Sequence, residues 1–186
     1  MNSKNFYEPI AYLSARLMYS LNKYALKNDK YLNINEKELH RGVKLAYSDL
    51  LPYNRAKGKI ILLSAFTSTS EDEDLAKRWA GRKDTTSLYK TNLKFSVVFK
   101  IKNINRHEWI SNGIDIQKES KHKKEKEILY QPFSFYLVKD VKIDIENYTT
   151  DIDLETIGKI EILEEQIKFG KEIEYNESEG IMQVKK

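Results

Sequence analysis

Two glutamates, Glu125 and Glu127, stand two residues apart and immediately precede an apolar, β-prone run that begins at Ile128. In a β-strand, side chains at positions i and i+2 point to the same face. The spacing therefore predicts two carboxylates side by side on one face, at the start of a strand. Like charges so placed repel each other, which indicates a nearby cation or a shared chemical task. A solvated strand entrance without function is the alternative, and this motif alone leaves it open.

A second candidate is Arg41, which lies in an alternating segment over residues 38–45. If this segment is a strand, Arg41 shares its face with Leu39 and Val43. A guanidinium cannot give up its charge and needs an anion on an apolar face. The anion could belong to a structural salt bridge, or to a phosphate held by the planar guanidinium fork. On the opposite face, Gly42 would let a ligand or a backbone approach closely.

A third candidate is a cluster of hydroxyls, Thr67–Ser70, after the predicted buried strand 59–66. Residues 70–73 match a capping box, so we expect a helix that begins at Ser70 and ends before Gly81. The role of helix N-cap accounts for Ser70. It does not account for Ser68, which is predicted at the end of the strand, where a small hydroxyl can reach a ligand.

The elements that must position these residues form an α+β pattern. An amphipathic helix is predicted over residues 8–27, and a short helix or turn around Pro52. Further strands are predicted at 93–101, 125–138, 141–145, 159–163 and 167–169, with a short ordered island at 113–116 and a loop at 148–153. From Gly170 the chain turns polar and acidic, so we expect one catalytic domain over 1–169 and a loose tail over 170–186.

Composition narrows the function classes. The chain has 186 residues, 40% hydrophobic and 32% charged, as in a single soluble domain. The net charge of +4 is too mild to indicate a nucleic-acid partner. Without cysteine, neither a disulfide framework nor a thiolate metal site can form. The N-terminus lacks the apolar core of a signal peptide, and no apolar run could span a membrane. We expect a monomer with no membrane partner.

The order of the three features resembles the arginine–serine–glutamate (R-S-E) class of mono-ADP-ribosyltransferases, which includes bacterial toxins, phage enzymes and animal arginine-modifying enzymes. The resemblance extends from about residue 38 to residue 138. Leu39–Gly42 is similar to the family's first motif, and Ser68–Ser70 to its second. Ile114–Ile116, Ser120 and Glu125–Leu129 are together similar to the third motif and its preceding loop.

This resemblance implies two packed, mainly antiparallel sheets around an NAD cleft. Arg41 would hold an NAD phosphate, and Ser68 would orient Glu127. Glu127 would stabilise the positive charge on the ribose as its bond to nicotinamide opens. Glu125, the first residue of the Glu-X-Glu pair, would bind an arginine acceptor, and no metal is implied. The residues expected at the NAD site are Arg41, Gly42, Ser68, Thr69 and Glu127.

The loop before Glu125 departs from the family pattern. It carries Lys121, Lys123 and Lys124 but no aromatic residue, whereas members that act on arginine often place an aromatic there. A basic loop repels a basic acceptor unless acids on the target compensate, so we expect an arginine near an acidic protein surface. Arg78, Arg82 and Lys83 remain alternative phosphate contacts after the second motif.

Two other functions stay open. NAD hydrolysis uses water as the acceptor, and a degenerate member would only bind. The joint presence of Arg41, Ser68, Glu125 and Glu127 argues against the degenerate member. Either a cytoplasmic enzyme or an effector delivered to a host cell by a specialised secretion system fits the N-terminus.

Overall fold

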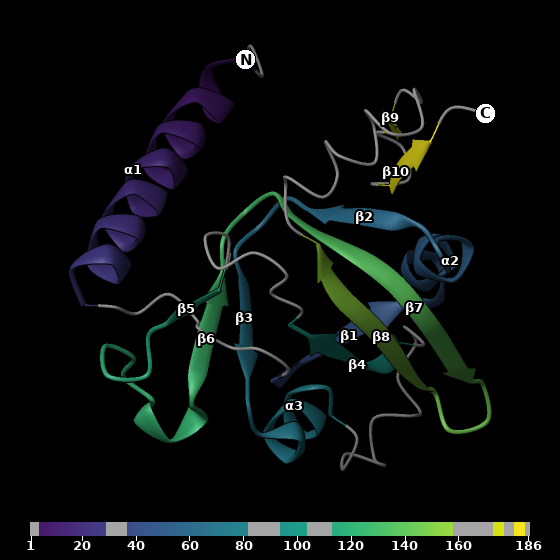
Figure 1. Cartoon of the computed structure of the whole chain (residues 1–186). Coiled ribbons are helices and arrows are strands. Elements are labelled where there is room, and N and C mark those ends of the chain that lie inside the picture. The colour runs from purple at the N-terminus through teal and green to yellow at the C-terminus, as the bar shows by residue number, and fades with distance from the viewer. Residues whose placement is uncertain are drawn as a thin grey trace.

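The computed structural model describes residues 4–28, 37–81, 94–103, 113–157, 173–176 and 181–184. Within these ranges the helices fall in the first two thirds of the chain, among strands, and the last five elements are all strands (Figure 1). The helices are α1 (Lys4–Asn28), α2 (Tyr47–Arg55), α3 (Glu73–Trp79) and the 3-10 helix η2 (Lys123–Glu125). The strands are β1 (Glu38–Ala46), β2 (Ile60–Leu63), β3 (Thr67–Ser70), β4 (Lys94–Lys102), β5 (Gly113–Asp115), β6 (Glu127–Tyr130), β7 (Ser134–Asp144), β8 (Thr149–Ile157), β9 (Ile173–Asn176) and β10 (Ile181–Val184). The α+β mixture agrees with the sequence prediction.

The described strands are joined in one hydrogen-bonded order, β5-β6-β3-β1-β4-β8-β7-β2-β10-β9. Neighbouring strands are antiparallel except β4 and β8, which are parallel. The link between β3 and β1 consists of one residue pair, His40 with Ser70, whereas β1 and β4 pair along their full length. The prediction of two separate packed sheets is therefore not confirmed for the described strands. Instead, the described strands form one sheet, in which a single residue pair joins β3 to β1.

The main core lies on one face of the central strands. Leu39 of β1, Val97 of β4 and Ile152 of β8 are completely buried there. Helix α2 packs on the same core through Leu50, which is also completely buried. Burying a side chain of this size stabilises the fold by about 1.5–3 kcal/mol. Because Arg41 follows Leu39 by two residues, strand alternation places it on this face, at the edge of the core.

Helix α3 covers the opposite face of β1 at Gly42. A Cβ atom built on Gly42 would lie 1.7 Å from the carbonyl oxygen of Ala76. Ala76 and Ala80 of the α3 segment are fully buried against Val98 of β4. The close approach that Gly42 permits is therefore that of the α3 backbone, one of the two alternatives that the sequence left open.

Strand β8 corrects the prediction of a loop over 148–153. It lies between β4 and β7, at the centre of the sheet. Thr150, Ile152 and Leu154 are buried in strict alternation along it. The aspartates between these residues, Asp151 and Asp153, made the segment resemble a polar loop. They fit a strand because they lie on its outer face, where lysines accompany them.

The C-terminal segment also differs from its prediction. Where a loose tail is expected after Gly170, β9 pairs with β10, and β10 pairs with β2 through Ile181 and Ile61. The strands predicted at 159–163 and 167–169 lie outside the described residues.

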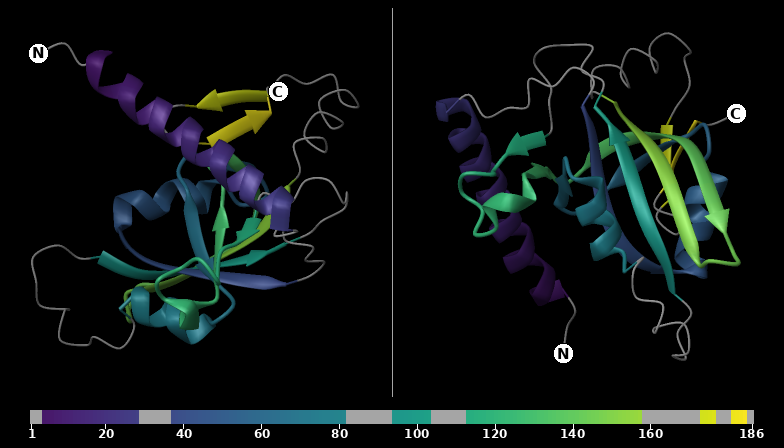
Figure 2. Two further views of the ribbon diagram at one scale, coloured as in Figure 1. Left: turned by 90° about the vertical axis from the view of Figure 1, so that its left-hand side faces the viewer. Right: turned by 90° about the horizontal axis from the view of Figure 1, so that it is seen from below.

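Helix α1 confirms the predicted N-terminal helix and lies beside the β5–β6 edge of the sheet (Figure 2). Within the described residues, no helix is long and apolar enough to cross a membrane.

Candidate active site

Arg41 is held at the junction of β1 and β3. Its Nη1 donates a hydrogen bond to the backbone carbonyl oxygen of Ser68, at 3.0 Å. Burial lowers the pKa of Arg41, although a guanidinium in a protein keeps its charge. Burial also raises the pKa of the neighbouring phenols of Tyr53 and Tyr136, so both are neutral. No carboxylate in the described part of the chain forms an ion pair with Arg41.

Ser68 connects Arg41 to Glu127. Ser68 lies in β3 and pairs with Leu129 of β6, which brings its side chain beside that of Glu127, two residues before Leu129. The Ser68 hydroxyl donates to Glu127 Oε1 at 2.6 Å. One residue thus accepts from Arg41 through its backbone and donates to Glu127 through its side chain. Two hydrogen bonds therefore connect the three residues, Arg41, Ser68 and Glu127, across β1, β3 and β6.

Thr69 points to the other side of β3. It is completely buried, and its hydroxyl donates to the backbone carbonyl of Ile128 at 2.8 Å. This hydroxyl links β3 to β6 and has no access to a ligand in this structure. Thr69, which the sequence analysis placed at the NAD site, thus has its side chain engaged within the sheet, and strand alternation separates it from Ser68.

Glu125 does not share a strand face with Glu127, which corrects the prediction. Glu125 ends the 3-10 helix η2, and β6 begins only at Glu127. Between them, Lys126 has φ +46° in the left-handed region, so the i and i+2 rule for strands does not apply. The two carboxylates therefore project from different backbone structures, that of Glu125 from the end of η2 and that of Glu127 from the start of β6.

Ser70 holds the turn that contains Glu125. Its hydroxyl donates to the backbone carbonyl of Glu125 at 2.6 Å and accepts from the backbone N–H of Asp72 at 2.9 Å. The predicted role as helix N-cap is wrong, because Asp72 caps α3 and accepts from the N–H of Leu75 at 3.0 Å. The Ser-Thr-Ser alternation, read as a strand, could have predicted that Ser68 and Ser70 share a face.

The alternative phosphate contacts receive less support. The side chain of Arg78 is exposed on α3, and Arg82 and Lys83 lie outside the described residues. Trp79, at the end of α3, is 37% exposed.

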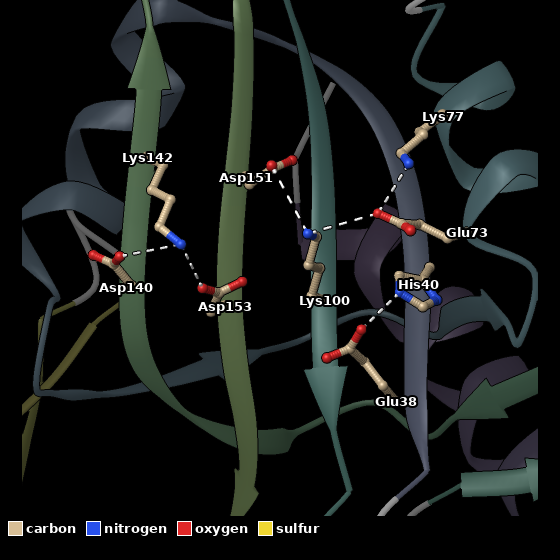
Figure 3. A network of polar contacts seen from close by, with 9 residues as sticks. All are labelled: Glu38, His40, Glu73, Lys77, Lys100, Asp140, Lys142, Asp151 and Asp153. Atoms are coloured by element: carbon tan, nitrogen blue, oxygen red, sulfur yellow. Dashed lines mark hydrogen bonds and ion pairs between the residues drawn. The ribbon is translucent and has the colours of Figure 1, made fainter.

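The face of the sheet opposite the main core carries a ladder of paired charges (Figure 3). Lys100 lies 3.6 Å from Glu73 and 3.9 Å from Asp151. His40 Nε2 lies 3.0 Å from Glu38 Oε1, so it faces away from the site, as expected of a bystander. Within the described ranges, no group of three or more His, Cys, Asp or Glu residues could hold a metal ion.

No protein-family model and no curated protein matches this sequence. Solved structures do match. Vis toxin, an ADP-ribosyltransferase from Vibrio splendidus, is similar with a TM-score of 0.60 and 21% identity, over 98% of this chain and 71% of that chain. Vis in complex with agmatine gives a TM-score of 0.52 and 21% identity, over 80% of this chain and 59% of that chain. The ATR domain of Salmonella SpvB gives a TM-score of 0.54 and 16% identity, over 85% of this chain and 76% of that chain.

The chain therefore has the fold of the ADP-ribosyltransferases. Vis toxin is one protein that shares this fold, and in an inhibitor complex of Vis the present chain spans 58% of the length of the matched chain.

Proposed function

We propose that this chain is a mono-ADP-ribosyltransferase of the R-S-E class, which transfers ADP-ribose from NAD to an arginine side chain of a protein and releases nicotinamide. The observation that carries the proposal is the contact from Arg41 through Ser68 to Glu127. These three residues are far apart in the sequence, and they meet on neighbouring strands in a chain with the fold of this enzyme class.

Arg41 suits the phosphates of NAD. A half-buried guanidinium without an ion-pair partner among the described residues favours binding of an anion. Its one hydrogen bond within the described residues leaves further N–H groups for phosphate oxygens. Bidentate contact to phosphate is the interaction for which arginine is preferred to lysine.

Glu127 suits the ribose that carries nicotinamide. In transfer, the bond between ribose C1 and the nicotinamide nitrogen breaks, its electron pair leaves with nicotinamide, and positive charge develops on the ribose. A carboxylate already fixed by Ser68 stabilises that charge without first reorganising, which is the most effective form of electrostatic catalysis.

Glu125 suits the acceptor. It lies on the turn outside β6, and the adjoining loop is exposed and basic. We propose that it binds the acceptor guanidinium and takes its proton, while Lys121, Lys123 and Lys124 favour an arginine within an acidic protein surface. Agmatine, bound in one Vis complex, contains the same guanidinium group.

The proposed setting follows from the same assignment. The NAD cleft would lie at the junction of β1, β3 and β6, within a catalytic domain over 1–169. The enzyme would act as a monomer, either in the cytoplasm or as a toxin-like effector delivered to a host cell.

Labelled NAD tests the proposal directly. The wild-type chain is incubated with NAD labelled in the adenylate part, together with agmatine or an arginine-containing peptide. We expect labelled acceptor and free nicotinamide. Glu127→Ala should lower both transfer and hydrolysis at least about 10²-fold, the scale for one preorganised electrostatic group. Calorimetric titration should show that this variant still binds NAD.

The other outcomes discriminate between functions. Free ADP-ribose without labelled acceptor would replace transfer by NAD hydrolysis. If the folded wild-type chain produced neither, the enzymatic proposal would be wrong and a binding module would remain.

A further inference from the structure

Helix α1 is attached to the segment that carries the two catalytic glutamates. The side chains of Asn22 and Gln131 exchange two hydrogen bonds, at 2.6 and 3.3 Å. The hydroxyl of Tyr24 donates to Glu119 Oε1 at 2.9 Å. Ala25, which follows Tyr24, is completely buried. Because Glu119 precedes the pair of glutamates and Gln131 follows it, α1 holds both flanks of this segment.

The opposite side of α1 is exposed and has an ordered pattern. A spacing of seven residues, nearly two helical turns, places Tyr12, Tyr19 and Leu26 in one row, and they are 65%, 68% and 73% exposed. The neighbouring row on the same face is basic and also exposed, and it consists of Arg16, Lys23 and Lys27. The Arg16 guanidinium lies 5.7 Å from the centre of the Tyr12 ring, so the two rows are in contact.

These cations differ from the lysines of the charge ladder on the sheet. In the ladder of Figure 3, Lys77, Lys100 and Lys142 each lie within 4 Å of a carboxylate. Arg16, Lys23 and Lys27 have no ion-pair partner in the described part of the chain. The same holds there for the exposed lysines of the attached loop, which are Lys118, Lys121, Lys123, Lys124 and Lys126. Helix α1 and the loop therefore present eight exposed cations that lack an ion-pair partner among the described residues.

We propose that the exposed face of α1 and the attached loop form one docking surface for an acidic protein. Tyrosine and arginine dominate the energetic centres of protein interfaces, and both occur here in adjacent rows. The unpaired cations select a partner with carboxylates at matching positions.

The arrangement of α1 disfavours a membrane surface as the partner. A helix that lies on a membrane needs one unbroken apolar face, with its basic residues on the other side. On α1 the basic row runs between the tyrosine row and a second exposed apolar pair, Leu13 and Leu17.

This inference extends the proposed function, because docking on α1 would bring an arginine of the bound protein to the end of the loop, beside Glu125. The surface would then raise the apparent affinity for a protein acceptor. It would leave NAD cleavage and transfer to a free small acceptor unchanged.

Binding is tested without NAD, so that the result does not depend on catalysis. The probe is a fluorescein-labelled peptide of alternating glutamate and glycine with one central arginine, followed by fluorescence anisotropy. The test variant is Arg16→Glu/Lys23→Glu. Lys59→Glu/Lys94→Glu is the matched control, because it changes net charge equally at the exposed start of β2 and of β4, away from the β5 edge. Circular dichroism melts verify that both variants fold.

We expect the wild-type chain and the control to bind the peptide within about twofold of each other, and the test variant about tenfold more weakly, as for two reversed surface charges. Binding should weaken with salt. Equal binding by the test variant, or none by the wild-type chain, would overturn the proposal. Tighter binding of a 12-base-pair DNA duplex, or of phosphatidylserine–phosphatidylcholine vesicles, would also overturn it, in favour of nucleic acid or membrane.

The kinetic arm separates this inference from the proposed function. With NAD present, the test variant should show a KM about tenfold higher for the acidic peptide, with unchanged NAD hydrolysis and unchanged transfer to agmatine. An unchanged KM for the peptide would refute the docking role. A wild-type chain that binds the peptide but cleaves no NAD would refute the enzymatic function and leave the docking surface supported.

Discussion

Ser68→Ala is the most selective test of the proposed site, because it removes one of the two contacts that Ser68 makes. The hydroxyl that donates to Glu127 at 2.6 Å is lost. The backbone carbonyl that accepts from Arg41 at 3.0 Å remains. A hydrogen bond to a charged group is worth about 1.5–3 kcal/mol. If the bond acts mainly in the transition state, kcat should fall about 10- to 100-fold, since each 1.4 kcal/mol is a factor of ten.

The assay is nicotinamide release at varied NAD concentration, with and without agmatine. Because Glu127 is proposed to serve the donor, hydrolysis and transfer should fall together. The KM for NAD should change less than about threefold, since the Arg41 contact is retained. Ser96→Ala is the matched control. It removes a hydroxyl that donates to the backbone carbonyl of Ala80, on the face covered by α3, so it should lower stability by about 1 kcal/mol and leave kcat unchanged.

Two results would refute this reasoning. A raised KM with normal kcat would mean that Ser68 binds NAD equally in the ground and transition states. Normal values for both constants would mean that Glu127 needs no orientation from Ser68.

Three further predictions follow from the same geometry. Arg41→Lys should weaken NAD binding in a calorimetric titration despite the retained charge, because an ammonium cannot replace the guanidinium fork; a lower melting temperature with normal NAD affinity would instead make Arg41 structural. Glu125→Gln should lose transfer to agmatine and keep measurable NAD hydrolysis, and an equal loss of both would disprove the division of roles. Gly42→Ala should destabilise the fold by about 3 kcal/mol, because its Cβ would lie 1.7 Å from the Ala76 carbonyl oxygen, and a calorimetric melt should show a drop of about 6–12 °C; an unchanged melt would mean that α3 moves away without cost.

The sequence was informative where local periodicity and packing agree. Alternation along 38–45 placed Arg41 and Leu39 on one face, and both face the main core side in the structure. Alternation failed to predict β8, because the acids between its buried residues are balanced by lysines on neighbouring strands. One of these lysines lies on β4, which is distant in the sequence, and the other on the preceding strand β7.

Long-range contacts explain what the sequence could not predict. The bonds of α1 to Glu119 and Gln131 join residues 95 and 109 positions apart, and no local pattern encodes such pairing. Ser70 was assigned to a helix cap because the next three residues fit a capping box. Its actual partner, the Glu125 carbonyl, lies 55 positions away.

The clearest gain from the structure concerns the two glutamates, which the strand rule made equivalent. The left-handed turn at Lys126 separates them. Glu127 is part of the sheet, and the Ser68 hydroxyl fixes its carboxylate, as the stabilisation of a developing charge requires. Within the described residues, Glu125 is held through its backbone, whose carbonyl accepts from Ser70 and whose N–H donates to the His122 carbonyl. Its side chain is therefore positioned by the turn and by the loop that α1 contacts through Tyr24. A carboxylate on such a turn is placed to meet a partner that arrives from outside the fold. This asymmetry is the physical reason to expect that loss of Glu127 affects every reaction of NAD, whereas loss of Glu125 affects the choice of acceptor.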